Sequence, residues 1–127
     1  DGTLLKNTSN EKLDQIISRH GKTSHRQEEA LMSSKQFLKN IPKSDKVVLT
    51  TARANRHKEH TIKVLEYVGI KYDQIIFDIP SGARILVNDI KPKGAVKNEH
   101  EIKTAFAINV KRNEGLKKEH LNEYLRV

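Results

Sequence analysis

Short apolar runs alternate with amphipathic segments along this chain, and that alternation limits the possible folds more than any other feature. Four runs are short and bounded by polar residues, as buried strands are, at residues 47–50, 74–77, 84–87 and 104–110. Apolar residues spaced three and four apart predict four helices, at residues 13–20, 26–39, 55–67 and 116–125. Such alternation is typical of a mostly parallel sheet covered on both faces. We therefore expect the α/β class, as a Rossmann-like three-layer sandwich.

Length and composition exclude several classes of protein. The chain has 127 residues, which suits one domain, so we expect a single domain over residues 1–127. Cysteine is absent, which excludes disulfides and thiolate chemistry. No stretch approaches the roughly 20 apolar residues of a membrane span. We expect a cytoplasmic protein with no membrane partner.

The net charge favours an anionic partner. Lysine and arginine number 24 against 16 acidic residues, for a formal charge of +8. Phosphorylated metabolites, nucleic acid and membrane surfaces all attract such a chain, although a solvated basic surface needs no partner. The lysines are dispersed, and with three Phe, three Tyr and no Trp there are few aromatic rings to stack on bases. Nucleic acid is therefore the weaker expectation.

Ligands of open parallel sheets bind at the carboxyl ends of the strands, so the polar residues that follow the predicted strands are the candidates. They are Thr50, Thr51, Asp78, Asn88 and Asp89. The Thr51 hydroxyl and the free amides of the next helix would form a small anion site, or Thr51 is simply a helix cap. Arg53 either adds charge to that pocket or is solvated.

Asn88 and Asp89 end the predicted strand at residues 84–87. A carboxylate in this place suits a hard cation such as Mg²⁺. Asn and Asp also favour turns, because their side chains bond the nearby backbone. A metal site therefore needs further ligands.

Three segments resemble motifs of the haloacid-dehalogenase-like superfamily, in the order and spacing of that family. Asp1-Gly2-Thr3-Leu4 resembles the second half of its Asp-x-Asp-Gly-Thr signature. Residues 47–53 resemble its second motif, an apolar strand ending in Thr, and residues 85–89 resemble its fourth, an apolar strand ending in an acidic pair. The similarity runs from residue 1 to about residue 110.

The resemblance implies a Mg²⁺-dependent phosphohydrolase that acts through an aspartyl-phosphate on small phosphorylated metabolites, sugar phosphates among them. Asp1 would be the general acid and base, with its backbone carbonyl on the metal. Thr51, with Thr50, would hold the phosphoryl group. Asp89 would bind Mg²⁺ with help from Asn88.

The chain departs from the family pattern in two places. The nucleophile would lie two positions before Asp1, so we expect an apolar strand to precede Asp1; the alternative is a catalytically inactive binding module. Ile79 stands where similar sequences have a lysine that balances the phosphate charge. Arg84 or Lys91 would replace that lysine, or both are surface charges.

The remaining length leaves room for a small flap before residue 47 but not for a large cap domain. An uncapped site would be open, and would accept larger phosphorylated substrates or depend on an oligomer or partner to close it. His57 and His60 have the i, i+3 spacing of some metal sites, but no further ligands complete such a site. All six histidines are therefore expected on the surface or on helix faces: His20, His25, His57, His60, His100 and His120.

Overall fold

The computed structural model describes residues 1–127 apart from the side chain of Val96. Its helices and strands are, in chain order, α1 (Asn10–His20), α2 (Met32–Lys39), β1 (Val48–Thr50), α3 (Lys58–Val68), β2 (Gln74–Ile76) and α4 (Lys118–Leu125). Three short 3₁₀ helices accompany them, η1 (Gly21–Arg26), η2 (Asn55–His57) and η3 (Ala95–Lys97). None of the described helices combines the length and apolarity that a membrane crossing needs.

The sheet that the structure describes consists of β1 and β2, which pair in parallel with Leu49 opposite Ile75. The pairing continues past β1, because the Thr51 amide donates to the Ile76 carbonyl at 3.0 Å. A parallel pair needs a crossover connection, and α3 provides it. The first two predicted strands are therefore confirmed, and the chain combines helices with a small parallel sheet, as expected for the α/β class.

Local sequence explains where α1 begins and where α1 and α3 end. The Ser9 side chain caps α1 by accepting a hydrogen bond from the Lys12 amide at 3.1 Å, and Gly21 follows the last turn. Gly69 ends α3 with a left-handed backbone at φ 78°, which glycine adopts without steric cost. Helix boundaries predicted at these two glycines are confirmed.

The helix predicted at residues 26–39 is shorter than expected, because α2 begins at Met32. The Lys6 amide donates to the Glu29 carbonyl at 2.9 Å, and the Leu31 amide donates to the Leu4 carbonyl at 2.8 Å. These bonds use the backbone groups that another turn of helix would need. Pairing with the N-terminal segment thus replaces helix before Met32.

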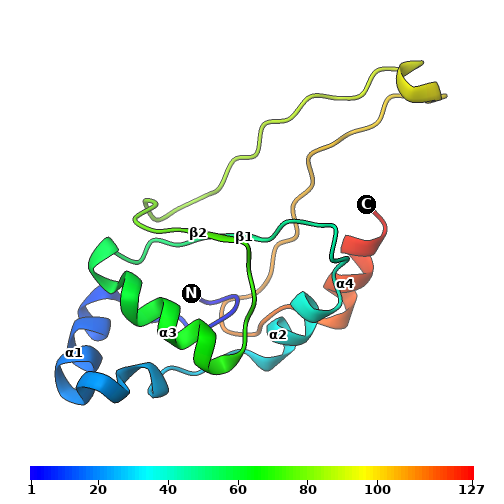
Figure 1. Ribbon diagram of the computed structural model, residues 1–127. Helices are drawn as coiled ribbons and strands as arrows, with labels where there is room; N and C mark the ends of the chain where they lie inside the picture. Colours follow the sequence, from blue (N-terminus) through cyan, green and yellow to red (C-terminus); the bar gives the residue numbers. More distant parts are fainter.

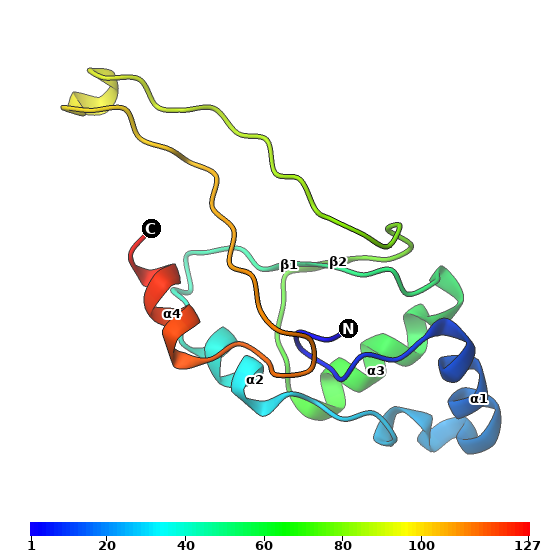
Figure 2. The same cartoon turned by 180° about the vertical axis from the view of Figure 1, so that it is seen from behind.

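The hydrophobic core lies between the strands, α3 and the N-terminal segment. Val64 and Leu65 of α3 pack with Leu5 and Ile70, and Leu49 and Ile75 reach the same cluster from the strands. Both ribbon views place α1, α2 and α3 on the side of the strand pair away from the long projection (Figures 1 and 2). The candidate residues Thr50 and Thr51 come directly after Leu49, which packs against this core.

The third and fourth predicted strands are wrong in this structure. Residues 84–87 and 104–110 have no regular strand pairing, and they belong largely to a projection, residues 84–106, that we call the arm (Figure 1). Its two limbs meet in one isolated antiparallel bridge between Lys91 and Ile102. A strand forms only beside another backbone, and neither run lies in register with β1 or β2.

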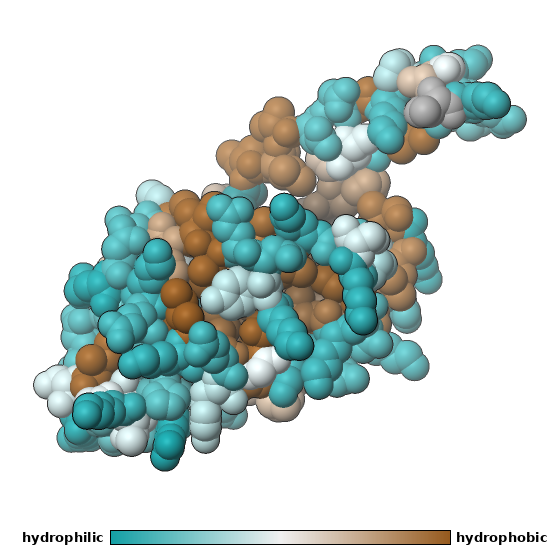
Figure 3. Space-filling model, in the orientation of Figure 1, coloured by the Kyte–Doolittle hydropathy of each residue, from teal (hydrophilic) through white to brown (hydrophobic). Residues whose placement is uncertain are grey.

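The arm consequently exposes apolar side chains that the sequence predicted to be buried. Ile85 and Val87 are 87% and 88% exposed, and Leu86 and Phe106 are also exposed. Hydrophobic side chains cover part of the arm close to the body (Figure 3). The three-layer sandwich is therefore not seen, and a two-stranded α/β arrangement takes its place.

Candidate functional site

A polar cavity of about 490 Å³ lies at the carboxyl end of β1. Five residues singled out in the sequence, from three separate segments of the chain, line it together: Asp1, Thr50, Thr51, Arg53 and Arg84. The rest of its wall comes from Asn7, Thr8, Ser9, Asn10, Glu11, Ala52, Ser81, Gly82 and Arg112. Its volume falls in the range of small-molecule sites, roughly 300–1,000 Å³.

Thr51 is held firmly at the end of β1. Its amide donates to Ile76, its carbonyl accepts from the Ile79 amide at 3.0 Å, and its Oγ1 accepts from the Arg53 amide at 3.1 Å. The hydroxyl thus stabilises a local turn and does not cap the next helical segment, whose N-cap residue is Ala54. Its proton is not used in that bond and can be donated to an anion in the cavity.

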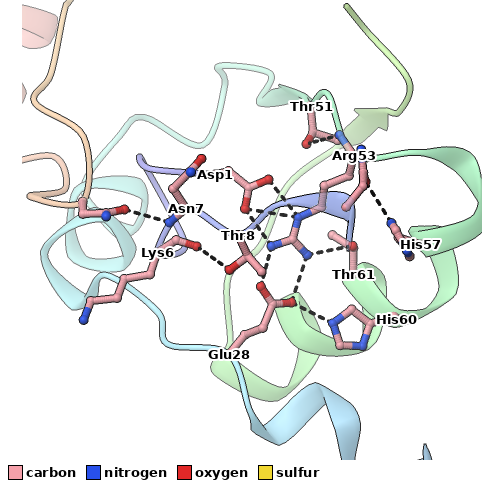
Figure 4. Close-up of polar contacts among 12 residues, drawn as sticks. Asp1, Lys6, Asn7, Thr8, Glu28, Thr51, Arg53, His57, His60 and Thr61 are labelled. Atoms are coloured by element: carbon pink, nitrogen blue, oxygen red, sulfur yellow. Dashed lines mark hydrogen bonds and ion pairs between the residues drawn. The ribbon is translucent and has the colours of Figure 1, made fainter. Parts of the chain in front are cut away.

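Arg53 is buried between two carboxylates, with its side chain 2% exposed (Figure 4). Its Nη2 lies 2.7 Å from an oxygen of Asp1, and its Nη1 donates to Glu28 at 2.9 Å and to the Thr61 hydroxyl at 3.0 Å. A guanidinium suits this place because its donors are rigidly planar and match carboxylates in pairs. Arg53 therefore fixes the Asp1 carboxylate at the cavity wall and is not a solvated side chain.

Glu28 joins this cluster from the segment before α2, and sequence reasoning missed it. The His60 Nε2 atom lies 2.7 Å from Glu28, while its Nδ1 lies 3.1 Å from the Ser24 hydroxyl. Burial alone would raise the pKa of the Glu28 carboxyl, but hydrogen bonds from His60 and Arg53 outweigh burial and lower this pKa to about 2. Glu28 is thus a buried anion that anchors Arg53.

His57 lies in a second polar cluster behind the cavity. Its Nδ1 lies 2.9 Å from Asn10 and its Nε2 lies 2.7 Å from Asp14, both on α1. Hydrogen bonds from Arg56, and then from His57, lower the pKa of Asp14 to about 2. These bonds tie α1 to the start of α3. Neither His57 nor His60 is on the surface, since both are buried by tertiary contacts; His60 lies on a buried face of α3.

Arg112 is the cavity residue for which the sequence held no signal, because it lies outside every motif. Its aliphatic stem packs over Gly2, where an added Cβ would meet the Arg112 Cγ at 3.2 Å. The Asn113 amide donates to the Gly2 carbonyl at 2.8 Å, and the Asn7 amide donates to the Asn113 side chain at 2.7 Å. Two hydrogen bonds thus join the loop at residues 111–115 to the N-terminal segment.

Three predicted site residues lie on the arm and are not among those that line the cavity. Asn88 donates to the Thr104 carbonyl at 3.4 Å, the Asp89 carbonyl accepts from the Thr104 hydroxyl, and Lys91 pairs with Ile102. Residues 84–87 pair with no strand, so the residues that follow them are not held at the edge of the sheet.

The residues expected to bind Mg²⁺ do not form a cation site as they are placed. Asp89 is on the arm and is not among the residues that line the cavity with Asp1, whose backbone carbonyl was the other expected ligand. Within the described part of the chain there is no group of three or more His, Cys, Asp or Glu side chains that could hold a metal ion. The donors have the right chemistry for Mg²⁺, but this geometry does not fit it.

Comparison of the chain with protein-family models, with curated proteins and with solved structures gives no match. The resemblance to haloacid-dehalogenase-like proteins therefore rests on the three motifs alone. In the structure, residues of two of these motifs lie together: Asp1 from the first and Thr51 from the second border the same cavity.

Proposed function

We propose that the cavity binds the phosphoryl group of a small phosphorylated metabolite, such as a sugar phosphate, and that the protein hydrolyses it through an aspartyl-phosphate. One observation carries the proposal. Asp1, Thr50, Thr51 and Arg84, chosen from sequence motifs, line one polar cavity at the carboxyl end of a parallel strand.

The side chains in the cavity have the chemistry that phosphoryl binding needs. The Thr51 hydroxyl can donate to a phosphoryl oxygen, and the Arg84 guanidinium can neutralise its charge. Arg84 is held nearby because its Nη1 donates to the Pro80 carbonyl at 2.8 Å and to the Gly82 carbonyl at 3.1 Å. Arg84 is thus the better replacement for the family lysine, since it lines the cavity and Lys91, farther along the arm, is not among the lining residues.

Asp1 supplies the proton-transfer group of the proposed mechanism. An aspartate nucleophile attacks phosphorus, and the leaving oxygen takes a proton from the Asp1 carboxyl. Asp1 then accepts a proton from the water that hydrolyses the aspartyl-phosphate. Hydrogen bonds from the Nε and Nη2 atoms of Arg53 hold this carboxylate at the cavity wall, so the proton is delivered from a defined position.

The proposed nucleophile belongs to a strand beside β1, on the edge away from β2. A cavity of about 360 Å³ borders β1, and apolar side chains on its wall include Leu4, Leu5, Val48, Leu49 and Leu65. An apolar strand in this place would end near Thr50 and Asp1, and would give the runs at residues 84–87 and 104–110 a backbone to extend. The three-layer sandwich and the open, uncapped site are part of this proposal.

Dependence on Mg²⁺ stays a prediction from the resemblance. It requires Asp89 to approach Asp1, which the position of the arm does not provide. No step of the mechanism above is assigned to the ion. A cytoplasmic location and closure of the site by an oligomer or partner are likewise predictions.

The test compares the 127-residue chain with a chain extended by the residues encoded before Asp1. With an aryl phosphate and Mg²⁺, we expect negligible turnover from the first and clear turnover from the second. Changing the restored nucleophile from Asp to Asn should reduce turnover by several orders of magnitude, since the remaining groups recover little of the rate. Thr51→Val should weaken phosphate binding, whereas Thr23→Val, at an exposed threonine away from the cavity, should not.

Two outcomes would change the conclusion. Vigorous hydrolysis by the 127-residue chain would mean that the nucleophile has been misplaced. An extended protein that binds phosphate analogues but hydrolyses no phosphomonoester would favour the inactive binding module. That alternative has its own support, since Asp1 and Glu11 are the only carboxylates among the cavity residues named above.

A further inference from the structure

We propose that the substrate carries a second anionic group, either a carboxylate or another phosphate, and that Arg112 binds it. This inference deepens the proposed function and rests on it. It comes from a pair of arginines in the cavity, Arg84 and Arg112, of which the motifs account for only the first.

Arg112 is built into the cavity wall through its backbone and its stem. Its neighbour Asn113 bonds both Gly2 and Asn7, while the Arg112 methylenes cover Gly2. Gly2 has φ 78° and no side chain, so a residue with a Cβ would strain this turn and crowd the Arg112 stem. The loop and the N-terminal segment therefore place Arg112 beside Asp1 without using its guanidinium.

The charges in the cavity leave Arg112 available for a ligand. Arg53 is already compensated by Asp1 and Glu28, in ion pairs of 2.7 and 2.5 Å. Arg84 bonds only backbone carbonyls, and Arg112 has no hydrogen bond or ion pair to a side chain among the described residues. Glu11 is the remaining carboxylate in the wall, so two cations face one anion.

The two arginines reach the cavity from different segments of the chain. Thr50, Thr51 and Arg84 lie next to β1 and β2 and suit the transferred group, whereas Arg112 enters from the loop that packs on the N-terminal segment. A cavity of about 490 Å³ has room for a ligand larger than phosphate itself. Two uncompensated cations brought into one cavity by different segments favour a ligand with two anionic groups.

Titration calorimetry with three sugars of similar size tests the inference. The probes are glucose 6-phosphate, 6-phosphogluconate and glucose 1,6-bisphosphate; the last two add a carboxylate or a phosphate at the far end. Because a hydrogen bond to a charged group contributes about tenfold or more in affinity, at least one of them should bind about tenfold tighter than glucose 6-phosphate. The carboxylate and phosphate probes distinguish the two kinds of second anion.

Variants of Arg112 locate the effect. Arg112→Gln should abolish the preference and leave the affinity for glucose 6-phosphate within about twofold, while Arg112→Lys should keep part of the preference because it keeps the charge. Arg126→Gln, at an exposed arginine beyond α4, is the matched control and should change nothing. Circular dichroism of each variant checks that the fold is retained.

Several results would overturn the inference. They are equal binding of the three sugars, binding of none of them, a preference that survives in Arg112→Gln, or a variant that weakens all three sugars alike. Hydrolysis is measured separately, so the two proposals fail in different ways. Turnover of glucose 6-phosphate without any preference would refute this inference alone, and a preference without turnover would refute only the hydrolase.

Discussion

At the scale of single residues, the buried group with the largest consequence is Glu28. Its side chain is 2% exposed and pairs with Arg53 and His60. Removing one partner of a buried ion pair leaves the other charge without compensation and costs about 3–5 kcal/mol. Nothing in the motifs marked Glu28, because its role depends on partners 25 and 32 residues away.

We expect Glu28→Gln to lower the free energy of unfolding at pH 7 by about 3–5 kcal/mol, measured by urea denaturation. The folded-state pKa of Glu28 is about 2, below its ordinary value of 4.5, so its stabilisation is complete above pH 4.5 and disappears as the pH falls toward 2. The difference between wild type and variant should therefore narrow over that interval.

Glu29→Gln is the matched control, because the neighbouring Glu29 side chain is 65% exposed and pairs only with Lys6. Exposed pairs contribute little, so we expect a change below about 1 kcal/mol at any pH. A constant difference between wild type and Glu28→Gln from pH 7 to pH 2 would contradict the assigned charge of Glu28.

At the scale of elements, α3 joins the core to the site. Val64 and Leu65 face the strands, while Thr61 and His60 on the same helix bond Arg53 and Glu28. Its amphipathic spacing and its terminal glycine made the helix predictable from sequence. The use of its polar face was not predictable, since helical periodicity does not say which polar residues are buried.

We expect Leu65→Ala to destabilise the protein by about 2–5 kcal/mol, through lost burial and the cavity that remains. Leu125→Ala changes the same side chain at a position on α4 that is 54% exposed, and should cost less than about 1 kcal/mol. Thermal unfolding of the two variants beside wild type measures the difference. Equal losses would show that α3 does not carry the core.

At the scale of the whole molecule, the arm contrasts with the body. It has a single β-bridge and exposed apolar side chains, whereas α3 is packed on the strands. Segments with few buried contacts open at low free energy. The arm also carries Asn88 and Asp89, so its position decides whether the motif residues can meet.

Hydrogen exchange followed by mass spectrometry should therefore show amides of residues 84–106 exchanging at least about a hundredfold faster than those of α3. Brief trypsin treatment should cut first within the arm. Extension of the chain before Asp1 should slow exchange at residues 84–87, if the added strand pairs there. Protection of the arm equal to that of α3 in the 127-residue chain would contradict the structure described above.

Local patterns in the sequence were sufficient for the α/β class, for β1, β2 and most of the helices, and for the cavity residues Thr50, Thr51 and Arg84. Apolar spacing and capping residues act within a few positions, so they can be read without a fold. Two further apolar runs, at residues 84–87 and 104–110, were also predicted to be strands, because local patterns do not show whether a neighbouring backbone is present. Apolar character favours a strand, but a partner backbone is needed to form one.

Three features could be seen only in the tertiary structure. Arg53, Glu28 and His60 form a buried cluster, His57 forms hydrogen bonds with α1, and Arg112 lines the cavity. Each depends on side chains brought together from distant segments, and such charges look like solvated surface when read one at a time. Burial makes these charged groups interact strongly, because each loses its contacts with water and has only the other groups as partners. The sequence by itself identified the residues after β1 that line the cavity, and packing determined which charges surround them.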